Sequence, residues 1–249
     1  MSDGVATLTL NRPDVLNGLT AEMRAEILDA VTKAPELARV LVLTGKGRGF
    51  CSGQDLLNAM QAGAVDLEKT LRQEYEPMLR AIHHCPIPTI SAVNGPAAGA
   101  GANLALAADV VIAAHSAYFL QAFALIGLIP DAGGTYILPR NVGFAKAMGA
   151  SLFADRISAE EAVQCGLIYE AVADDAFAEH IARRAATLAQ GPTEGYRLIK
   201  QAIRASFDND LDTQLDLEAR LQGQAGKTRD FTEGVSAFIE KRKAGFTGN

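Results

Sequence analysis

The sequence predicts an α/β fold followed by a helical C-terminal region. In the first two thirds of the 249 residues, short apolar runs typical of buried strands alternate with amphipathic segments of helical period. From about residue 174 the pattern indicates only helices, with turns near Gly191-Pro192, residues 208–210 and Gly226. Hydrophobic residues make up 49% of the chain, which is enough for a full core in one large domain, alone or with a helical appendage.

The first four elements follow from local patterns. Residues 5–10 alternate apolar and polar side chains, as a half-buried strand does. Thr20 is a favourable N-cap, and the segment after it is amphipathic to about Lys33. Residues 40–43 are continuously apolar and predict a short buried strand. A second helix is expected over about residues 66–83.

The next elements form a β-α-β passage. A strand is expected over residues 87–93, a helix over 100–107 and a strand over 109–114. Ser158-Ala-Glu-Glu161 has the capping-box pattern, so another helix begins there. Three or four helices complete the chain from about residue 174.

Composition and charge exclude several classes of protein. A net charge of −6 opposes nonspecific nucleic-acid binding, although Lys46, Arg48 and the run Lys241-Arg242-Lys243 could hold a phosphorylated ligand. The three cysteines are widely spaced, which argues against a disulfide framework and predicts a cytoplasmic protein. The N-terminus is not typical of a signal peptide, and no apolar run is long enough for a membrane span. We therefore expect no metal, no nucleic-acid partner and no membrane partner.

Two segments rich in small residues carry the candidate chemistry. Residues 94–103 lie between a strand and a helix, where small residues let a ligand approach the free N–H groups of the first helical turn. Residues 127–135 place Asp131 at an expected helix start among the apolar side chains of Ile126, Leu128 and Ile129. An anion site and one acid in apolar surroundings are what proton transfer next to a carbonyl requires.

Part of these motifs also matches short-chain dehydrogenases. Gly95, Gly99 and Gly101 follow a strand, and Tyr196 and Lys200 have the spacing of the dehydrogenase catalytic pair. In that dinucleotide fold, however, the glycines follow the first strand and most of the sheet lies beyond them. Here the glycines come late and mostly helices follow, which argues against a dehydrogenase.

A third motif has the shape of a hydrolase nucleophile elbow. Gly49-Phe-Cys51-Ser-Gly53 places a cysteine where such enzymes have serine. The polar residues 45–49 separate it from its strand, and a buried inert thiol is the alternative for Cys51. None of the histidines lies in a recognisable triad context; they are His83, His84, His115 and His180.

Taken together, the motifs resemble the enoyl-CoA hydratase/isomerase (crotonase) superfamily along nearly the whole chain. The matching motifs, in order, are Asn11-Arg-Pro13 with Leu16-Asn17, Gly47-x-Gly-Phe-Cys-Ser-Gly-x-Asp-Leu56, Ala92-Val-Asn-Gly95 with Gly99-x-Gly101, Gly133-Gly-Thr135, and Glu233-Gly-Val-x-Ala-Phe-x-Glu-Lys-Arg242. The resemblance implies a crotonase (ClpP-like) spiral of β-β-α units over residues 1–190. It also implies a C-terminal helical region over residues 191–249 that assembles homotrimers, often paired into hexamers.

The resemblance also assigns candidate site residues. In the family two backbone N–H groups bind the thioester oxygen, and the motifs place them at Gln54 and Ala100. Such donors stabilise an enolate oxygen by roughly 3–4 kcal/mol each. Coenzyme A is part of the substrate, and no separate cofactor is implied. The residues expected to contact the acyl-CoA are Val15, Leu16, Ser52, Gln54, Asp55, Leu56, Gly99, Asn103, Phe123 and Pro130, with Phe238 and Lys241 reaching a neighbouring subunit's ligand.

Departures from the family pattern bear on the reaction. The hydratases use two glutamates to position and split water, and this chain has Asn103 and Phe123 at those positions. Neither side chain can act as a general base, which disfavours hydration. Asp131 remains as the candidate base, and its alternative role is an N-cap for a helix that begins at Ala132.

Within the superfamily, three segments most resemble the isomerases of bacterial phenylacetyl-CoA degradation: residues 97–101, 128–134 and 211–218. Those enzymes convert ring 1,2-epoxyphenylacetyl-CoA into oxepin-CoA and shift 3-enoyl-CoA double bonds to the 2-position. The resemblance therefore implies an acyl-CoA isomerase, with a hydratase or other lyase of the same fold as the alternative. Dehalogenases of the superfamily have tryptophan at the position of Phe123, and this chain has none. Phe123, Leu125 and Met60 could line a pocket for either an aromatic or an aliphatic acyl group.

Overall fold

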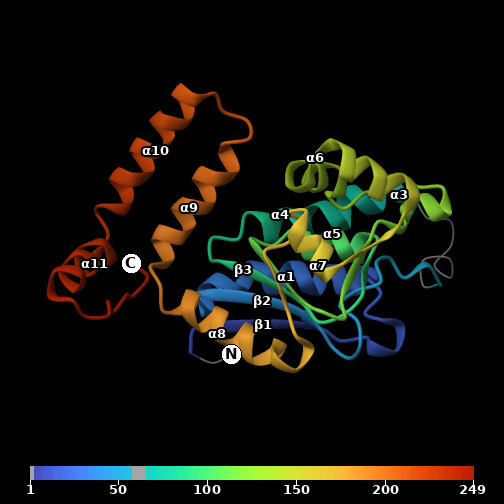
Figure 1. The fold of residues 1–249 in the computed structure, drawn as a ribbon, viewed down its shortest axis with the longest axis horizontal. Helices are drawn as coiled ribbons and strands as arrows, with labels where there is room; N and C mark the ends of the chain where they lie inside the picture. Colours follow the sequence, from blue (N-terminus) through green and yellow to red (C-terminus); the bar gives the residue numbers. More distant parts are fainter. Residues whose placement is uncertain (1–2, 58–65) are drawn as a thin grey trace.

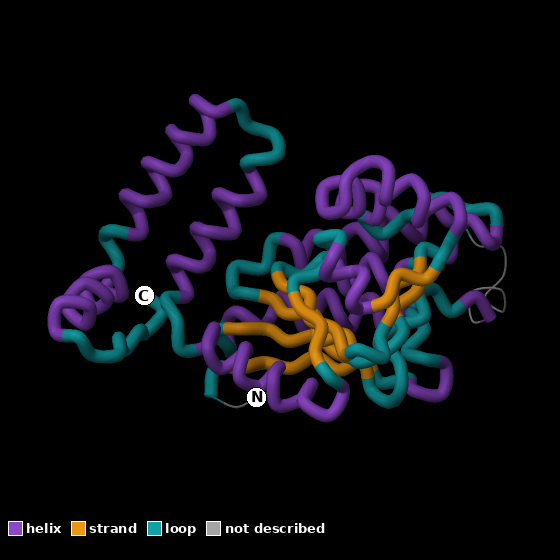
Figure 2. The backbone as a smooth tube through the Cα atoms, viewed as in Figure 1, coloured by secondary structure: helices purple, strands orange, loops and turns teal. Residues whose placement is uncertain are grey.

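The computed structural model describes residues 3–57 and 66–249 and contains two sheets, whose strands are orange in Figure 2. The larger sheet is parallel throughout, in the order β1-β2-β3-β5-β8. The smaller sheet has the order β4-β6-β7, with β4 parallel and β7 antiparallel to β6. The strands are β1 (Val5–Leu10), β2 (Val40–Gly45), β3 (Thr89–Val93), β4 (Ala97–Ala98), β5 (Val110–Ala114), β6 (Tyr118–Leu120), β7 (Arg156–Ser158) and β8 (Glu170–Val172).

Successive units of the chain contribute one strand to each sheet and then a helix. The unit β3-β4-α5 ends in α5 (Ala100–Leu106), and β5-β6 leads through the 3₁₀ turn η3 (Ala122–Ile126) to α6 (Gly134–Phe153). Before them, β2 leads to Cys51, which forms a parallel bridge to Ala97 and so extends the smaller sheet. This repeated β-β-α path is the predicted crotonase spiral, and the fold class is confirmed.

The two faces of the large sheet are covered by different helices (Figure 2). Alternation in β2 directs Val40 and Val42 toward α8 (Asp174–Ala189), whereas Leu41 and Leu43 join the main core. On that second face lie α1, the mixed helix over residues 67–83 and α5. Their bounds are α1 (Ala21–Leu37), α3 (Leu67–Thr70), the π-helical turn η2 (Leu71–Tyr75) and α4 (Glu76–His83); η1 (Pro13–Val15) and α7 (Ala159–Gln164) complete the body.

Most predicted elements are present, with shifted ends. Thr20 caps α1 as expected, since its Oγ1 accepts the N–H of Met23 at 3.2 Å, but the helix continues through Pro35 to Leu37. Ser158 caps α7 through the N–H of Glu161. The strands β4, β6, β7 and β8 were not predicted, because two or three residues are too few to show a period.

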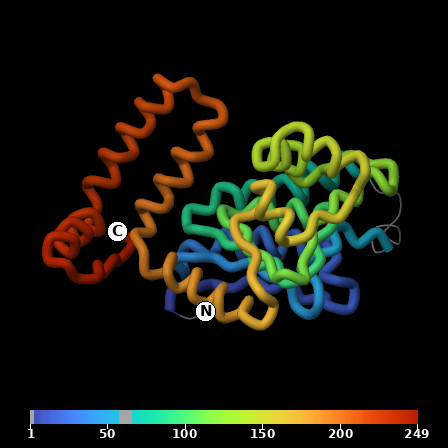
Figure 3. The backbone as a smooth tube through the Cα atoms, viewed as in Figure 1, coloured from blue at the N-terminus to red at the C-terminus, as the bar shows by residue number. Residues whose placement is uncertain are grey.

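The last three helices extend away from the body of the molecule (Figures 1 and 3). They are α9 (Thr193–Ala205), α10 (Leu211–Ala225) and α11 (Arg229–Glu240), and their turns lie where the sequence predicted them. The division into units 1–190 and 191–249 stays a prediction. Along residues 3–57 and 66–249, no helix combines the length and apolar character needed to cross a membrane.

We expect the protein to form a homotrimer or a dimer of trimers in dilute solution. Large apolar side chains on these helices are exposed to an extent that one subunit cannot bury, including Leu211 (72%), Phe238 (86%) and Ile239 (73%). Light scattering measures the assembly directly. A stable particle of 26.3 kDa at micromolar concentration would contradict this expectation.

Candidate active site

A cavity of about 230 Å³ lies where three successive turns of the spiral meet. Its walls come from the loop after Cys51, the start of α5, the π-helical turn η2 and the segment around η3. Most of its lining side chains are apolar, and Phe123 is buried in its wall. Among the described residues that line this cavity, Asp131 is the single carboxylate.

Glycines bring the first two turns into close contact at this cavity. The N–H of Ala98 donates to the carbonyl oxygen of Cys51 at 2.9 Å. A Cβ at Gly101 would lie 2.3 Å from that same oxygen, and one at Gly53 would lie 2.8 Å from the carbonyl oxygen of Ala98. Only glycine therefore fits at either position, and the close approach sets Gln54 beside the start of α5.

Two backbone N–H groups at this contact have no partner in the described part of the chain. Leu19 accepts from Asp55 at 3.1 Å and donates to Gly53 at 2.7 Å, so the N–H of Gln54, between them, faces away from Leu19. Ala100 is the first residue of α5, where the N–H has no intrahelical acceptor. Both residues line the cavity, and their N–H groups are a candidate oxyanion hole.

Asp131 stands on a reverse turn before α6. Ala132 and Gly133 both have left-handed backbone, with φ of 49° and 82°, and the N–H of Gly134 donates to the carbonyl oxygen of Asp131 at 2.9 Å. The alternative role, in which Asp131 caps a helix that begins at Ala132, is wrong. The turn delays the helix to Gly134, with Gly133 as N-cap, and leaves the Asp131 carboxylate free to face the cavity.

The Asn103 side chain holds the backbone of Asp131 in place. Its Nδ2 donates to the carbonyl oxygen of Asp131 at 2.7 Å, and its Oδ1 accepts from Gln121 Nε2 at 2.9 Å. A Cβ at Gly134 would lie 2.4 Å from that Nδ2, so this hydrogen bond requires glycine at position 134. The side chain of Asn103 is fully buried and does not line the cavity, which corrects its expected role as a substrate contact.

The Asp131 carboxyl has a shifted proton affinity. Its Oδ1 is buried and accepts no hydrogen bond from the described residues. Burial without a compensating donor disfavours the charged form and raises the pKa of Asp131 from 3.8 to about 6. A carboxylate with a pKa of about 6 is ionised at neutral pH yet is a stronger base than a solvated one.

This shift predicts the pH dependence of turnover. Asp131 is the candidate base and can take a proton only when ionised, so kcat/KM is expected to rise through about pH 6 and then to level off. The measurement is a pH profile of turnover of an enoyl-CoA, at saturating and at limiting concentration. A flat profile between about pH 5 and pH 8 would show that turnover does not depend on the ionisation of Asp131.

The predicted coenzyme A contacts lie in two regions. Near the cavity, the Ser52 hydroxyl donates to the carbonyl oxygen of Val15 at 3.1 Å, and the Ser52 N–H donates to that of Leu16 at 2.9 Å. Asp55 pairs with Arg12 at 2.8 Å, which fixes the same loop. The cavity-lining members of the set are Ser52, Gln54, Leu56, Gly99 and Phe123.

The remaining predicted contacts lie elsewhere. Pro130 lines an adjoining cavity that also includes Asp131. Phe238 and Lys241 belong to α11 and its end, far from α3 in Figure 1, so they do not line the cavity of their own chain. Their role toward a neighbouring subunit's ligand stays a prediction. Met60 lies outside the described residues.

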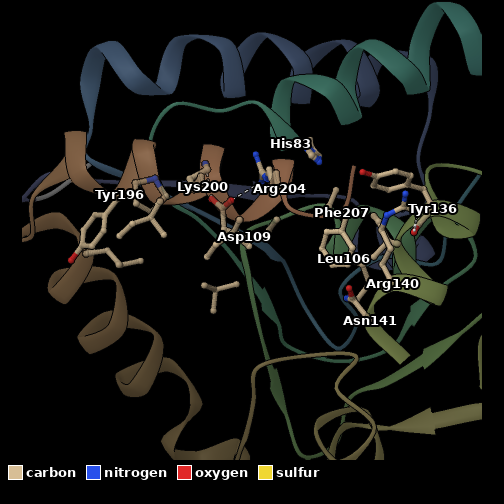
Figure 4. Close-up of a pocket in the computed structure, with 18 residues that line it drawn as sticks. His83, Leu106, Asp109, Tyr136, Arg140, Asn141, Tyr196, Lys200, Arg204 and Phe207 are labelled. Atoms are coloured by element: carbon tan, nitrogen blue, oxygen red, sulfur yellow. Dashed lines mark hydrogen bonds and ion pairs between the residues drawn. The ribbon is translucent and has the colours of Figure 1, made fainter. Parts of the chain in front are cut away.

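The Tyr196–Lys200 pair, whose spacing matches the catalytic pair of dehydrogenases, lines a different cavity, of about 430 Å³ (Figure 4). There Lys200 points toward Asp109, at 2.7 Å, and also donates to the carbonyl oxygens of Cys85 and Ile87. These bonds join α9 to the rim of the large sheet. Lys200 thus anchors the first helix of the C-terminal region, and no feature of this cavity indicates a catalytic pair with Tyr196.

Cys51 is not an activated nucleophile. Its thiol is fully buried, and it contacts the carbonyl oxygen of Asn17 and the N–H of Gly53. Burial raises the pKa of Cys51 to about 12, so the thiolate is not populated near neutral pH. The expected inert thiol is therefore the correct interpretation.

Sequence patterns missed a polar group behind the cavity. Arg24, Glu74 and Tyr75 form hydrogen bonds that reach the Gln54 side chain. One signal was present in the sequence, because Arg24 lies on the apolar face of α1, in step with Ile27 and other buried residues. A charged residue at such a position requires buried partners.

Fold and site together define a crotonase-fold protein with a candidate oxyanion site and one half-buried acid. The family model for enoyl-CoA hydratase/isomerase matches residues 1–249, and the chain belongs to this family. The resemblance inferred from the motifs is thereby confirmed.

Some relatives are named as hydratases and others as isomerases. A Rhodobacter capsulatus protein named "Probable enoyl-CoA hydratase" is 58% identical, over 100% of this chain and 96% of its own length. The 1,2-epoxyphenylacetyl-CoA isomerase of Escherichia coli is 50% identical, over 98% of this chain and 95% of its own. The solved structure of the Bacillus anthracis enoyl-CoA hydratase has a TM-score of 0.92 at 33% identity, covering 99% of this chain and 96% of that one.

Proposed function

We propose that the protein is an isomerase of CoA thioesters that works through an enolate. The observation that carries the proposal is the carboxylate of Asp131, the single one among the described residues that line a small apolar cavity. The N–H groups of Gln54 and Ala100, at the same cavity, have no acceptor in the described part of the chain. One base and one oxyanion site suffice to move a proton along an acyl chain. No further acid is needed.

The steps balance with one mobile proton. Asp131 takes the α-proton of a 3-enoyl-CoA, and the electron pair of that C–H bond moves into the C–C bond and onto the thioester oxygen. The N–H groups of Gln54 and Ala100 hold the resulting enolate oxygen. The protonated carboxyl then returns the proton to the γ-carbon, and the double bond lies at the 2-position. No water is added or lost.

The acyl group can be aliphatic or aromatic. The cavity walls are apolar, which suits a hydrocarbon chain or a ring. The 50% identity to the Escherichia coli 1,2-epoxyphenylacetyl-CoA isomerase supports a ring epoxide of phenylacetyl-CoA as a second substrate, converted to an oxepin-CoA. Removal of a proton next to the thioester and enolate stabilisation apply to both.

Hydration is the competing function, because the relative at 58% identity has a hydratase name. Adding water to a 2-enoyl-CoA needs a group that positions and deprotonates the water. Asn103 is buried and its side chain donates a hydrogen bond to the carbonyl oxygen of Asp131, and Phe123 is apolar. Neither position therefore supplies that group. This difference favours isomerisation.

The test is direct. The protein is incubated with a 3-enoyl-CoA and, separately, with a 2-enoyl-CoA in ¹⁸O-labelled water. Ultraviolet absorbance of the conjugated 2-enoyl thioester measures isomerisation, and mass measures the addition of labelled water. We expect a 2-enoyl-CoA of unchanged mass from the first substrate and no labelled 3-hydroxyacyl-CoA from the second. Rapid label incorporation without isomerisation would establish the hydratase instead.

A further inference from the structure

The Gln54 side chain is held by two donors from different elements. Its Oε1 accepts from the Tyr75 hydroxyl at 2.6 Å and from Arg24 Nη1 at 2.8 Å. Arg24 comes from α1, and Tyr75 is the last residue of the π-helical turn η2. These two hydrogen bonds hold the Gln54 side chain in one arrangement, whereas the side chain of a surface glutamine moves among several rotamers.

The donors are themselves fixed. Glu74 Oε2 accepts from Arg24 Nε at 3.0 Å and from Nη2 at 2.5 Å, and the guanidinium lies 4.5 Å from the centre of the Tyr75 ring. The Arg24 side chain is only 3% exposed. Burying a guanidinium is costly unless its hydrogen bonds are made, so the group retains its geometry only as a complete set.

Tyr75 connects this group to the reacting centre. It is buried and lines the cavity together with Gln54 and Asp131. Burial also raises the pKa of Tyr75, so its hydroxyl stays protonated and donates to Gln54. The π-helical turn sets the ring into the cavity wall, and such turns are frequent at functional sites.

We infer that Arg24 and Tyr75 are positioning residues for the oxyanion site. They hold the Gln54 side chain, and this keeps the Gln54 backbone N–H directed at the thioester oxygen. The bridge to Leu19 fixes the neighbouring peptide groups but makes no bond to the Gln54 N–H. The side-chain tether adds the second point of attachment. A donor stabilises an enolate only within narrow limits of distance and angle, so loosening this tether weakens the oxyanion site.

The inference rests on the oxyanion pair of the proposed function, but not on which reaction follows the enolate. A probe that reports only on the carbonyl hydrogen bonds therefore tests it. The infrared stretch of a ¹³C-labelled acyl-CoA carbonyl falls when the carbonyl accepts strong hydrogen bonds. An S-alkyl-CoA, with a methylene in place of that carbonyl, gives the affinity of the rest of the site.

The main variant is Tyr75→Phe, which removes one hydroxyl and keeps the ring. We expect a smaller lowering of the carbonyl frequency on binding, kcat reduced about tenfold, KM within about twofold and unchanged S-alkyl-CoA affinity. The matched control is Tyr169→Phe, at an exposed tyrosine of the body that does not line the cavity, and it should match the parent protein. A folded Tyr75→Phe protein that lowers the carbonyl frequency on binding as much as the parent does would overturn the inference.

A second pair of variants tests the tether from the other side and guards against misfolding of the first. Gln54→Glu keeps an acceptor for Arg24 and Tyr75, whereas Gln54→Met has similar length and no such acceptor. We expect Glu to preserve the carbonyl shift of the parent and Met to lose most of it, with backbone N–H present in both. Equal shifts in both would contradict the positioning role.

The outcomes separate this inference from the proposed function. If the parent does not isomerise a 3-enoyl-CoA but lowers the carbonyl frequency, and Tyr75→Phe reduces that lowering, the proposed reaction fails and the positioning role stands. If the parent isomerises and the frequency is the same in both proteins, the positioning role fails and the reaction stands.

Discussion

Asp131→Asn is expected to abolish isomerisation, with kcat lowered by about 10²–10⁴, the usual contribution of a general base. Asparagine has nearly the same shape and leaves the carbonyl oxygen of residue 131 free to accept from Asn103 and Gly134. Only the basicity is lost. Exchange of the substrate α-proton with solvent deuterium should stop in parallel, whereas affinity for an S-alkyl-CoA should be nearly unchanged.

The same variant is expected to fold at least as well as the parent. Because burial raises the pKa of Asp131 to about 6, the folded state binds this proton more tightly than the unfolded state does. The carboxyl therefore favours the fold at low pH and loses that advantage as pH rises from about 3.8 through about 6. Above that range the neutral asparagine avoids a half-buried charge whose Oδ1 accepts no hydrogen bond from the described residues, so Tm at pH 8 should be equal or higher.

Asp175→Asn is the matched control, because it changes an exposed aspartate of α8 outside the cavity. Its isomerisation rate should equal that of the parent. An Asp131→Asn protein that isomerises a 3-enoyl-CoA within tenfold of the parent rate would show that Asp131 is not the base, and the proposed mechanism would be wrong.

The candidate oxyanion pair was assigned from the family resemblance, and the close backbone contact beside it is visible in the sequence as glycines. Gly53 and Gly101 are required by contacts with Ala98 and Cys51, and a short motif around each glycine carries that requirement. The same holds for Gly134 against Asn103. Strands and helices with a clear period were predicted for a similar reason, because the signal lies within a few consecutive residues.

The setting of Asp131 could not be predicted, because it depends on contacts across the chain. Asn103 lies 28 positions before Asp131, and its amide could equally have faced a ligand. The reverse turn at Ala132 requires positive φ at a non-glycine residue, which a sequence pattern does not indicate. The sequence left an N-cap as the alternative role for Asp131, and the reverse turn excludes it.

The polar group at Gln54 shows a second limit. Arg24 meets Gln54 and Glu74 across 30 and 50 positions, and only the spiral brings the three together. A buried arginine on the apolar face of a helix signals that partners exist, but not which ones. Residues of short motifs are thus easier to predict than partners that lie far apart in the sequence.

The second large effect is expected for Ala100→Pro, which should lower kcat by about 10²–10³. Proline is accepted at the first position of a helix, where the N–H has no intrahelical acceptor, and the preceding Gly99 tolerates the local backbone. The substitution therefore removes an oxyanion donor while α5 can still form. The enolate would keep only the Gln54 N–H.

Ala100→Gly is the matched control, since it retains the N–H and removes a small buried side chain. We expect its turnover to stay within a few-fold of the parent, and S-alkyl-CoA affinity to be similar in both variants because that ligand has no carbonyl to hold. Circular dichroism and Tm establish that the proline protein is folded. Equal turnover in a folded Ala100→Pro protein would mean that the enolate oxygen is stabilised elsewhere, since proline has no N–H to donate.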